Sequence, residues 1–160
     1  MRTASKLIAG GAGLAAAIVR RAAFVALDWD TRQKSRFEAS DSNGTQLAVF
    51  LPRGRIVRGG DVLVCDDGSL VAVRAAPQPL LAVTAGVAGT PLDLLRAAYH
   101  LGNRHVPLEV TAVRLQLEPD HVLAELVQRM GLQVDACEAA FEPEAGAYDT
   151  HGAHHAHPHP

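Results

Sequence analysis

Hydrophobic and polar positions change their spacing about halfway along the chain. From Phe24 to Val73, apolar residues come in short alternating or continuous runs that are broken by turn residues, and no helical period appears. This pattern is typical of the short strands of a small β-sandwich or barrel. Asn43-Gly44 and Asp66-Asp67-Gly68 each separate two such runs, which predicts two hairpins. Residues 1–78 are therefore predicted to form an all-β domain.

The next segment contains a predicted boundary and a predicted helix. The run Ala75-Ala76-Pro77-Gln78-Pro79 holds two prolines, which interrupt strand pairing, so it is predicted to be a linker. Leu80–Thr84 then has the composition of a strand. Thr90-Pro91-Leu92-Asp93 has a hydroxyl N-cap, a proline at the first helical position and a carboxylate three residues after the cap. Gly102-Asn103 would end this helix, because both residues tolerate left-handed geometry. The apolar residues on one face of the helix are Leu92, Leu95 and Tyr99.

A second helix is predicted between its cap, Asp120, and its stop, Gly131. Three further runs have strand character: Val106–Val110, Val113–Leu117 (in which Arg114 and Gln116 alternate with apolar residues) and Leu132–Phe141. Residues 79–142 thus have the order β-α-β-β-α-β, which is that of a ferredoxin-like domain. Residues 143–160 are rich in Pro, Gly, Ala and His and predict a disordered, flexible tail. The predicted fold class is therefore α+β.

Composition narrows the classes of partner. A net charge of −2 favours neither nucleic acid nor an anionic membrane, and aromatic residues at 4% are too few to stack bases. Cys65 and Cys137 form no metal or redox motif and suit a reducing compartment. Six cations are predicted to give the first domain a basic face, which is either solvated or a docking patch for an acidic protein. They are Arg32, Lys34, Arg36, Arg53, Arg55 and Arg58.

The N-terminus superficially resembles a signal peptide, because Arg2 and Lys6 precede an apolar stretch from Leu7 to Val19. That stretch contains three glycines, ends on Arg20-Arg21 and is too short to span a bilayer. A cytoplasmic protein with an apolar start is the favoured interpretation. Gly10-Gly11-Ala12-Gly13 lacks the Lys-Ser/Thr of a phosphate loop and follows no clear strand, so no function is assigned to it.

Histidines are the main candidates for chemistry. Five of the eight lie in the last ten residues, at His151, His154, His155, His157 and His159. Neutral imidazole binds borderline transition metals near pH 7, and a Gly/Ala/Pro background holds the rings loosely. The tail is therefore predicted to bind metal, with an affinity tag or a chance His-rich terminus as the alternative.

The other three histidines lie on or near the two predicted helices. His100 and His105 are five residues apart and would not share a helix face, so they make a poor chelating pair within one chain. One of them could bind metal if a second copy supplied its twin across a two-fold axis; otherwise it is a helix-end residue. His121 could share a face with Glu125, but no third ligand is near in sequence. No nucleophile motif or acid/base constellation is present in the sequence, which predicts a metal-binding module rather than an enzyme.

The segment Arg96–Leu108, which contains Gly102-Asn103-Arg104-His105-Val106-Pro107, is very similar to the signature of the UreE family of urease accessory proteins. Arg32–Arg36, Leu51–Gly54 and Phe141–Tyr148 resemble further stretches of that family. The resemblance implies a homodimer in which His105 meets its twin around one Ni²⁺ ion. It implies that the tail histidines supply further ligands and that residues 1–78 form a domain of the type that binds a peptide or partner. In some members of the family a pair of histidines just before the second helix forms peripheral metal sites. His121 matches one histidine of that pair, whereas Pro119 stands at the position of the other.

The function implied by the resemblance is that of a nickel metallochaperone, which delivers Ni²⁺ to apo-urease during assembly of its active site. Zn²⁺ or Cu²⁺ could occupy the same site, and affinity order alone cannot select nickel, because Cu²⁺ should bind more strongly. The implied partners are urease structural subunits and urease accessory proteins, including the GTPase of the pathway. Two alternatives stay open: a His-rich metal storage or buffering protein, and a metal-dependent hydrolase.

Overall fold

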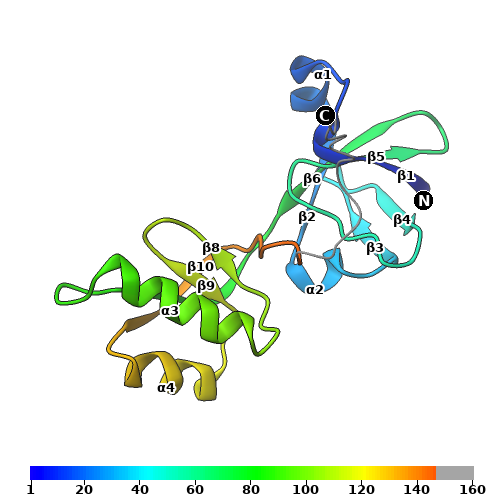
Figure 1. Cartoon of the computed structure of the whole chain (residues 1–160). Coiled ribbons are helices and arrows are strands. Elements are labelled where there is room, and N and C mark those ends of the chain that lie inside the picture. The colour runs from blue at the N-terminus through cyan, green and yellow to red at the C-terminus, as the bar shows by residue number, and fades with distance from the viewer. Residues whose placement is uncertain (147–160) are drawn as a thin grey trace, which may run out of the picture.

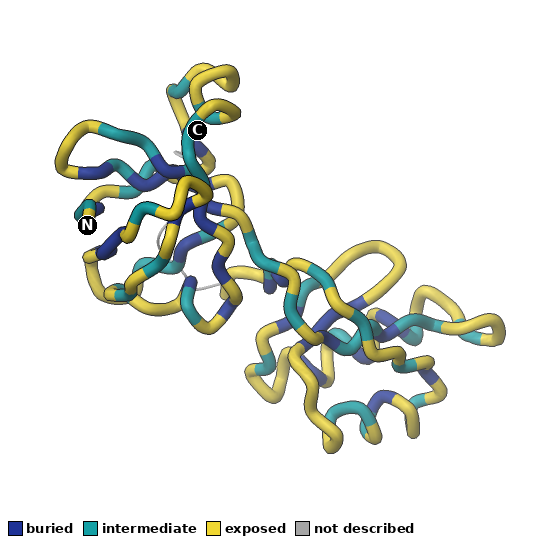
Figure 2. Tube along the Cα trace, turned by 180° about the vertical axis from the view of Figure 1, so that it is seen from behind, coloured by how far each residue is buried: buried dark blue, intermediate teal, exposed yellow. Residues whose placement is uncertain are grey.

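The structure is a computed structural model that describes residues 1–146. Figure 1 shows two bodies, each built around one β-sheet, and Figure 2 shows buried positions inside both of them. The predicted tail ligands His151, His154, His155, His157 and His159 lie outside the described residues. Within residues 1–146, no helix has the length and apolar character needed to cross a membrane.

The first sheet has six strands in the order β2-β6-β5-β1-β4-β3. Its strands are β1 (Arg2–Ile8), β2 (Ala23–Leu27), β3 (Arg36–Ser40), β4 (Gln46–Phe50), β5 (Val62–Cys65) and β6 (Leu70–Ala75). Both predicted hairpins are confirmed, since β3 pairs antiparallel with β4 and β5 with β6. The first hairpin loop is longer than the predicted Asn43-Gly44 pair, because Asp41 Oδ1 accepts hydrogen bonds from Asn43 N and Thr45 N at 2.8 and 2.9 Å.

Two predictions for the first half are wrong. The body is not all-β: it contains a 3-10 turn, η1 (Ala9–Gly11), and two short helices, α1 (Ala16–Arg21) and α2 (Trp29–Arg32). These helices are too short for an apolar period to show in the sequence. The glycine run that begins at Gly10 is expected from the sequence to follow no clear strand. In the structure β1 precedes it and lies inside the sheet, between β5 and β4. The strand buries only Ala4 fully, so its sequence lacks a strong alternation.

The predicted proline linker is also wrong. Strand β6 ends at Ala75, and β7 (Pro77–Thr84) begins after the single residue Ala76. Both prolines lie in a part of β7 that pairs with β10 on one side, whereas β9 pairs only from Leu81 onward. A missing N–H is tolerated where one side of a strand has no partner.

The second sheet has four antiparallel strands in the order β10-β7-β9-β8. Along the chain, β7 is followed by α3 (Pro91–Gly102), β8 (Glu109–Val110), β9 (Leu115–Leu117), α4 (His121–Arg129) and β10 (Gln133–Ala140). Both helices pack on one face of the sheet, where Leu94, Leu101 and Val127 share a core with Val83 and Leu117.

The first helix of this body starts as predicted, with a capping box in which Thr90 and Asp93 bond each other's backbone. The predicted polar alternation along β9 is wrong for Gln116, which is 1% exposed. The face of the sheet that carries Gln116 also carries Leu80 and Cys137, and Trp29 of the first body packs against the Leu80 end of this face. The sheet is therefore covered on both sides at this point.

Candidate metal site at the end of helix α3

His105 lies in the turn that ends α3, and backbone hydrogen bonds fix the form of that turn. The His105 N–H donates to Gly102 O at 3.0 Å, and the Val106 N–H donates to Leu101 O at 3.4 Å. These are the two bonds of a Schellman motif, in which the residue one before its end adopts a left-handed conformation. Here that residue is His105, with φ at 57°. The sequence prediction assigned left-handed geometry to Gly102-Asn103, but Asn103 is right-handed, with φ at −63°.

The left-handed conformation of His105 is unusual in this chain. Among residues 1–146, every other residue with positive φ is a glycine. Helix α4 ends in the same motif, and there Gly131 N donates to Gln128 O and Leu132 N to Val127 O. The equivalent left-handed residue is Gly131, with φ at 85°. A side chain at this position costs about 1–2 kcal/mol, and such strain is characteristic of functional sites.

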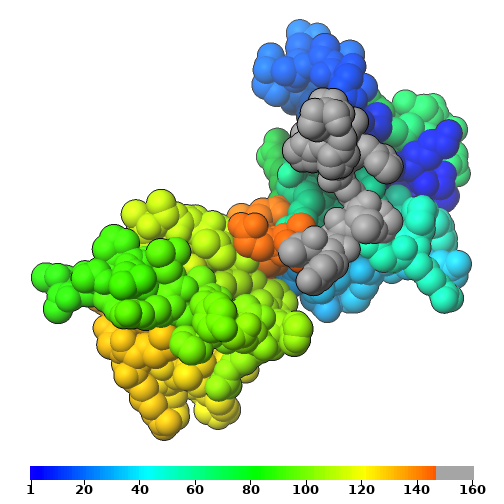
Figure 3. Space-filling view, viewed as in Figure 1, coloured from blue at the N-terminus to red at the C-terminus, as the bar shows by residue number. Residues whose placement is uncertain are grey.

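The outward face of helix α3 carries exposed apolar side chains. Helix α3 buries Leu94, Ala97 and Leu101, while the face predicted from spacing points outward. On that outward face Leu95 and Tyr99 are each 66% exposed. Figure 3 shows the helix on the molecular surface. Exposed apolar side chains in a row beside a polar residue are typical of a protein interface.

The other two histidines of the described chain are also exposed, but they do not gather around His105. The ring of His100 lies edge-on to Tyr99, with centroids 5.4 Å apart. His121 is the first residue of α4, and Glu125 on the next turn pairs with Arg129 at 3.4 Å. Within residues 1–146 no three His, Cys, Asp or Glu side chains come close enough to hold a metal ion.

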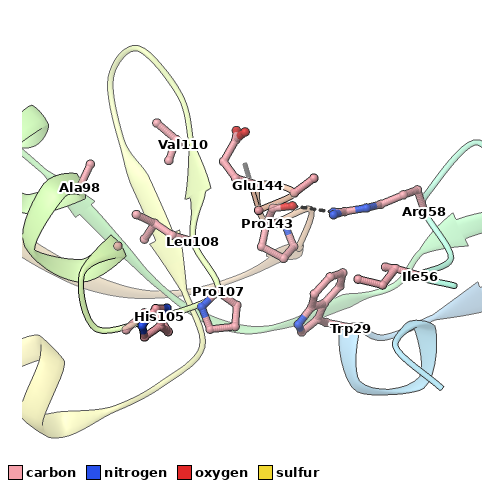
Figure 4. Close-up of a pocket in the computed structure, with 14 residues that line it drawn as sticks. Trp29, Ile56, Arg58, Ala98, His105, Pro107, Leu108, Val110, Pro143 and Glu144 are labelled. Atoms are coloured by element: carbon pink, nitrogen blue, oxygen red, sulfur yellow. Dashed lines mark hydrogen bonds between the residues drawn. The ribbon is translucent and has the colours of Figure 1, made fainter. Parts of the chain in front are cut away.

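Two grooves meet at His105. The smaller, of about 320 Å³, is also lined by Glu118 and Asp120, two carboxylates that the sequence pattern did not suggest as metal ligands. Asp120 is already used as the cap of α4, where its Oδ1 accepts from Leu123 N at 3.0 Å. The larger groove, of about 450 Å³, lies between the two bodies and is lined by Trp29, Pro107 and residues 143–146 (Figure 4). We call it the interdomain groove.

The basic face predicted for the first body is smaller than expected. Arg32 is fully buried, and its burial lowers the pKa of the guanidinium, an effect that nearby Glu142 opposes. Arg58 is half-buried and bonded to residues that follow β10. The exposed cations that remain around one polar groove of about 600 Å³ are Lys34, Arg36 and Arg53.

Comparison with known proteins identifies the family. The description "UreE urease accessory protein, N-terminal domain" matches residues 5–76, and "UreE urease accessory protein, C-terminal domain" matches residues 78–160. The chain belongs to the UreE family. The two UreE matches meet at the junction of β6 and β7, where the chain passes from one sheet to the other.

Individual UreE proteins are similar over nearly the whole chain. The urease accessory protein UreE of Methylibium petroleiphilum is 63% identical over 96% of this chain and 71% of its own length. That of Albidiferax ferrireducens is 62% identical over 99% of this chain and 91% of its own. That of Verminephrobacter eiseniae is 53% identical, with coverage of 100% and 99%.

Proposed function

We propose that this protein is a nickel metallochaperone that binds Ni²⁺ through His105 at a homodimer interface and delivers it to apo-urease. The observation that carries the proposal is the exposed imidazole of His105 in a left-handed position that Gly131 fills in the equivalent turn of α4. Residues other than glycine in strained backbone conformations cluster at functional sites. Urease maturation as the setting is supported by the names of the similar proteins.

Two observations on the described residues support the proposed dimer. A single imidazole is a weak metal site, and the described residues of one chain offer no cluster of three ligands. The outward row of Leu92, Leu95 and Tyr99 leads along α3 towards His105 and gives a second copy an apolar surface to cover. In an isologous dimer a residue near the two-fold axis meets its own twin. Two His105 imidazoles would then bind one Ni²⁺ ion.

Such a site suits a carrier. Two imidazoles leave coordination positions for water or for tail ligands among His151, His154, His155, His157 and His159, so that a recipient can exchange its own ligands in. His121 stays a candidate for a separate, weaker site. Zn²⁺ or Cu²⁺ would compete at the His105 pair, so selection of nickel falls to metal supply and partner docking. The proposed partners are the urease subunits and the accessory proteins of the pathway, including its GTPase.

The domain roles are part of the same proposal. We infer that residues 79–142 form a ferredoxin-like metal-binding domain, supported by the element order and by the strand order β10-β7-β9-β8. Residues 1–78 would serve as the partner-binding domain and residues 143–160 as the tail. A cytoplasmic location is proposed and agrees with Cys65 and Cys137 both being free thiols.

Nickel titration tests the proposal on the wild type, His105→Ala and a chain truncated after Tyr148. His105→Ala should abolish the tightest site, which has one Ni²⁺ per dimer, while His100→Ala, which removes another exposed histidine five residues away, should keep it. If His105→Ala retained that site and truncation alone removed it, the interface site would be wrong.

A metal storage or buffering protein is the second candidate, favoured by the five histidines in the last ten residues. Storage predicts that the number of bound ions follows the tail and that urease activation does not depend on His105. Reconstitution of apo-urease with each variant separates the two functions.

A further inference from the structure

The segment that precedes the tail is held by both bodies of the protein. From the first body, Arg32 Nη1 and Gly59 N donate to Glu142 Oε1 at 2.9 and 2.8 Å. Arg32 Nη2 also donates to Phe141 O. Arg58 Nη1 donates to Pro143 O at 2.6 Å, a bond drawn in Figure 4, and lies 3.4 Å from Glu142 Oε2.

The second body holds the same segment from the other side. Glu142 N donates to Glu109 Oε2 at 2.7 Å, and Glu144 N donates to Leu108 O at 2.8 Å. Four consecutive residues are thus fixed by five partners. Strand β10 ends at Ala140, so these bonds lie beyond the sheet that would otherwise hold this part of the chain.

We propose that residues 141–144 are an anchor that sets the root of the tail beside His105, and that Glu142 and Arg58 are its positioning residues. Residues 143–146 and His105 line the same interdomain groove. The tail that follows therefore begins at the metal site instead of at the end of the sheet. The inference rests on the proposed function, since it gives the anchor a role in metal binding.

The expected effect on metal binding follows from the number of residues between the last anchored residue and the first tail histidine. His151 lies seven residues after Glu144 but eleven after Ala140. The effective concentration of a tethered ligand falls as about the −3/2 power of tether length, so release of the whole anchor should lower that of His151 about twofold. The more distant tail histidines should lose less.

Four proteins test the anchor: the full chain, Arg58→Gln, the chain truncated after Tyr148, and the truncated Arg58→Gln. Arg58→Gln removes the bond to Pro143 O but leaves the buried Arg32–Glu142 pair, so the fold should be kept; Glu142→Gln is the second variant. Nickel affinity is measured by competition with a chelator. Each substitution removes only some of the bonds of the anchor, so the loss should be at most about twofold in the full chain and absent in the truncated one. Arg53→Gln, an exposed cation of the same body, is the control.

A metal-free measurement checks release of the segment directly. A glutamyl endopeptidase should cut after Glu144 several times faster in Arg58→Gln than in the wild type or in Arg53→Gln. An equal loss of nickel affinity with and without the tail would overturn the anchor, and so would an unchanged cutting rate. Failure of the proposed function would be seen separately, as an unchanged tight site in His105→Ala.

Discussion

Replacement of His105 by glycine should remove the proposed metal site and stabilise the metal-free protein at the same time. His105 is exposed and holds φ at 57° in the Schellman turn of α3. Glycine reaches that conformation without the Cβ clash that other residues meet. If His105 is the proposed metal ligand and is kept at a cost in stability, this one substitution should lower metal affinity and raise the free energy of unfolding.

The magnitude is best obtained by comparing glycine with alanine at the same position, which cancels the loss of the imidazole. An L-residue in left-handed geometry costs about 1–2 kcal/mol, and the greater freedom of glycine in the unfolded chain offsets about 0.4–1 kcal/mol of that gain. His105→Gly should therefore be more stable than His105→Ala by roughly 0.5–1 kcal/mol. For a chain of this length that is a rise of about 1–4 °C in the thermal midpoint.

Two positions serve as controls. Arg104, one residue earlier, is exposed and has no positive φ, so Arg104→Gly should be less stable than Arg104→Ala by about 0.5–1 kcal/mol. Gly131 occupies the left-handed position of α4 with nothing within 4 Å of an added Cβ. Gly131→Ala should therefore lose stability for conformational reasons alone. Urea unfolding of the metal-free proteins measures all of these differences. If His105→Gly proved less stable than His105→Ala, the strain argument for His105 would be refuted.

Further predictions concern the packing of the two bodies, the dimer and the start of α3. Glu142→Ala should lower the free energy of unfolding by about 2 kcal/mol, because it leaves the fully buried Arg32 without its counter-charge, and Arg32→Met should cost less; urea unfolding compares them. Leu95→Asp should convert the proposed dimer to monomers in sedimentation experiments while the circular dichroism spectrum stays unchanged, since Leu95 is exposed in one chain. Thr90→Ala should cost about 1 kcal/mol of stability in the same unfolding assay by removing the N-cap. Asp93 accepts hydrogen bonds from the Thr90 hydroxyl, which has the larger effect, and from the Thr90 backbone N–H. Both lower the pKa of the Asp93 carboxyl below 3.8. Its stabilising contribution is present above pH 3.8 and should be lost as the pH falls below that value, and Asp93→Asn should flatten this part of the pH–stability profile.

Features specified by neighbouring residues could be predicted from the sequence. The Asp-rich and Asn-Gly turns of the first body form the predicted hairpins, and the capping box at Thr90 begins α3 where the spacing indicated. Features that depend on distant partners could not. Strand β1 is held by β4 and β5, and the prolines of β7 are accommodated because β10 pairs with only one side of that strand. The burial of Arg32 depends on Glu142, which is far away in sequence.

The left-handed conformation of His105 depends both on neighbouring residues and on the core of the second body. Sequence rules assign a left-handed helix end to the nearest glycine or asparagine, which here are Gly102 and Asn103. Helix α3 ends at Gly102 but Asn103 keeps right-handed geometry, and Leu101 and Val106 close the motif with their side chains in the core of the second body. Those two apolar residues therefore determine which residue becomes left-handed. At the end of α4 the same arrangement of Val127 and Leu132 selects a glycine. The core thus requires a left-handed residue at position 105 but does not require histidine, so a requirement for its imidazole must come from outside the single chain.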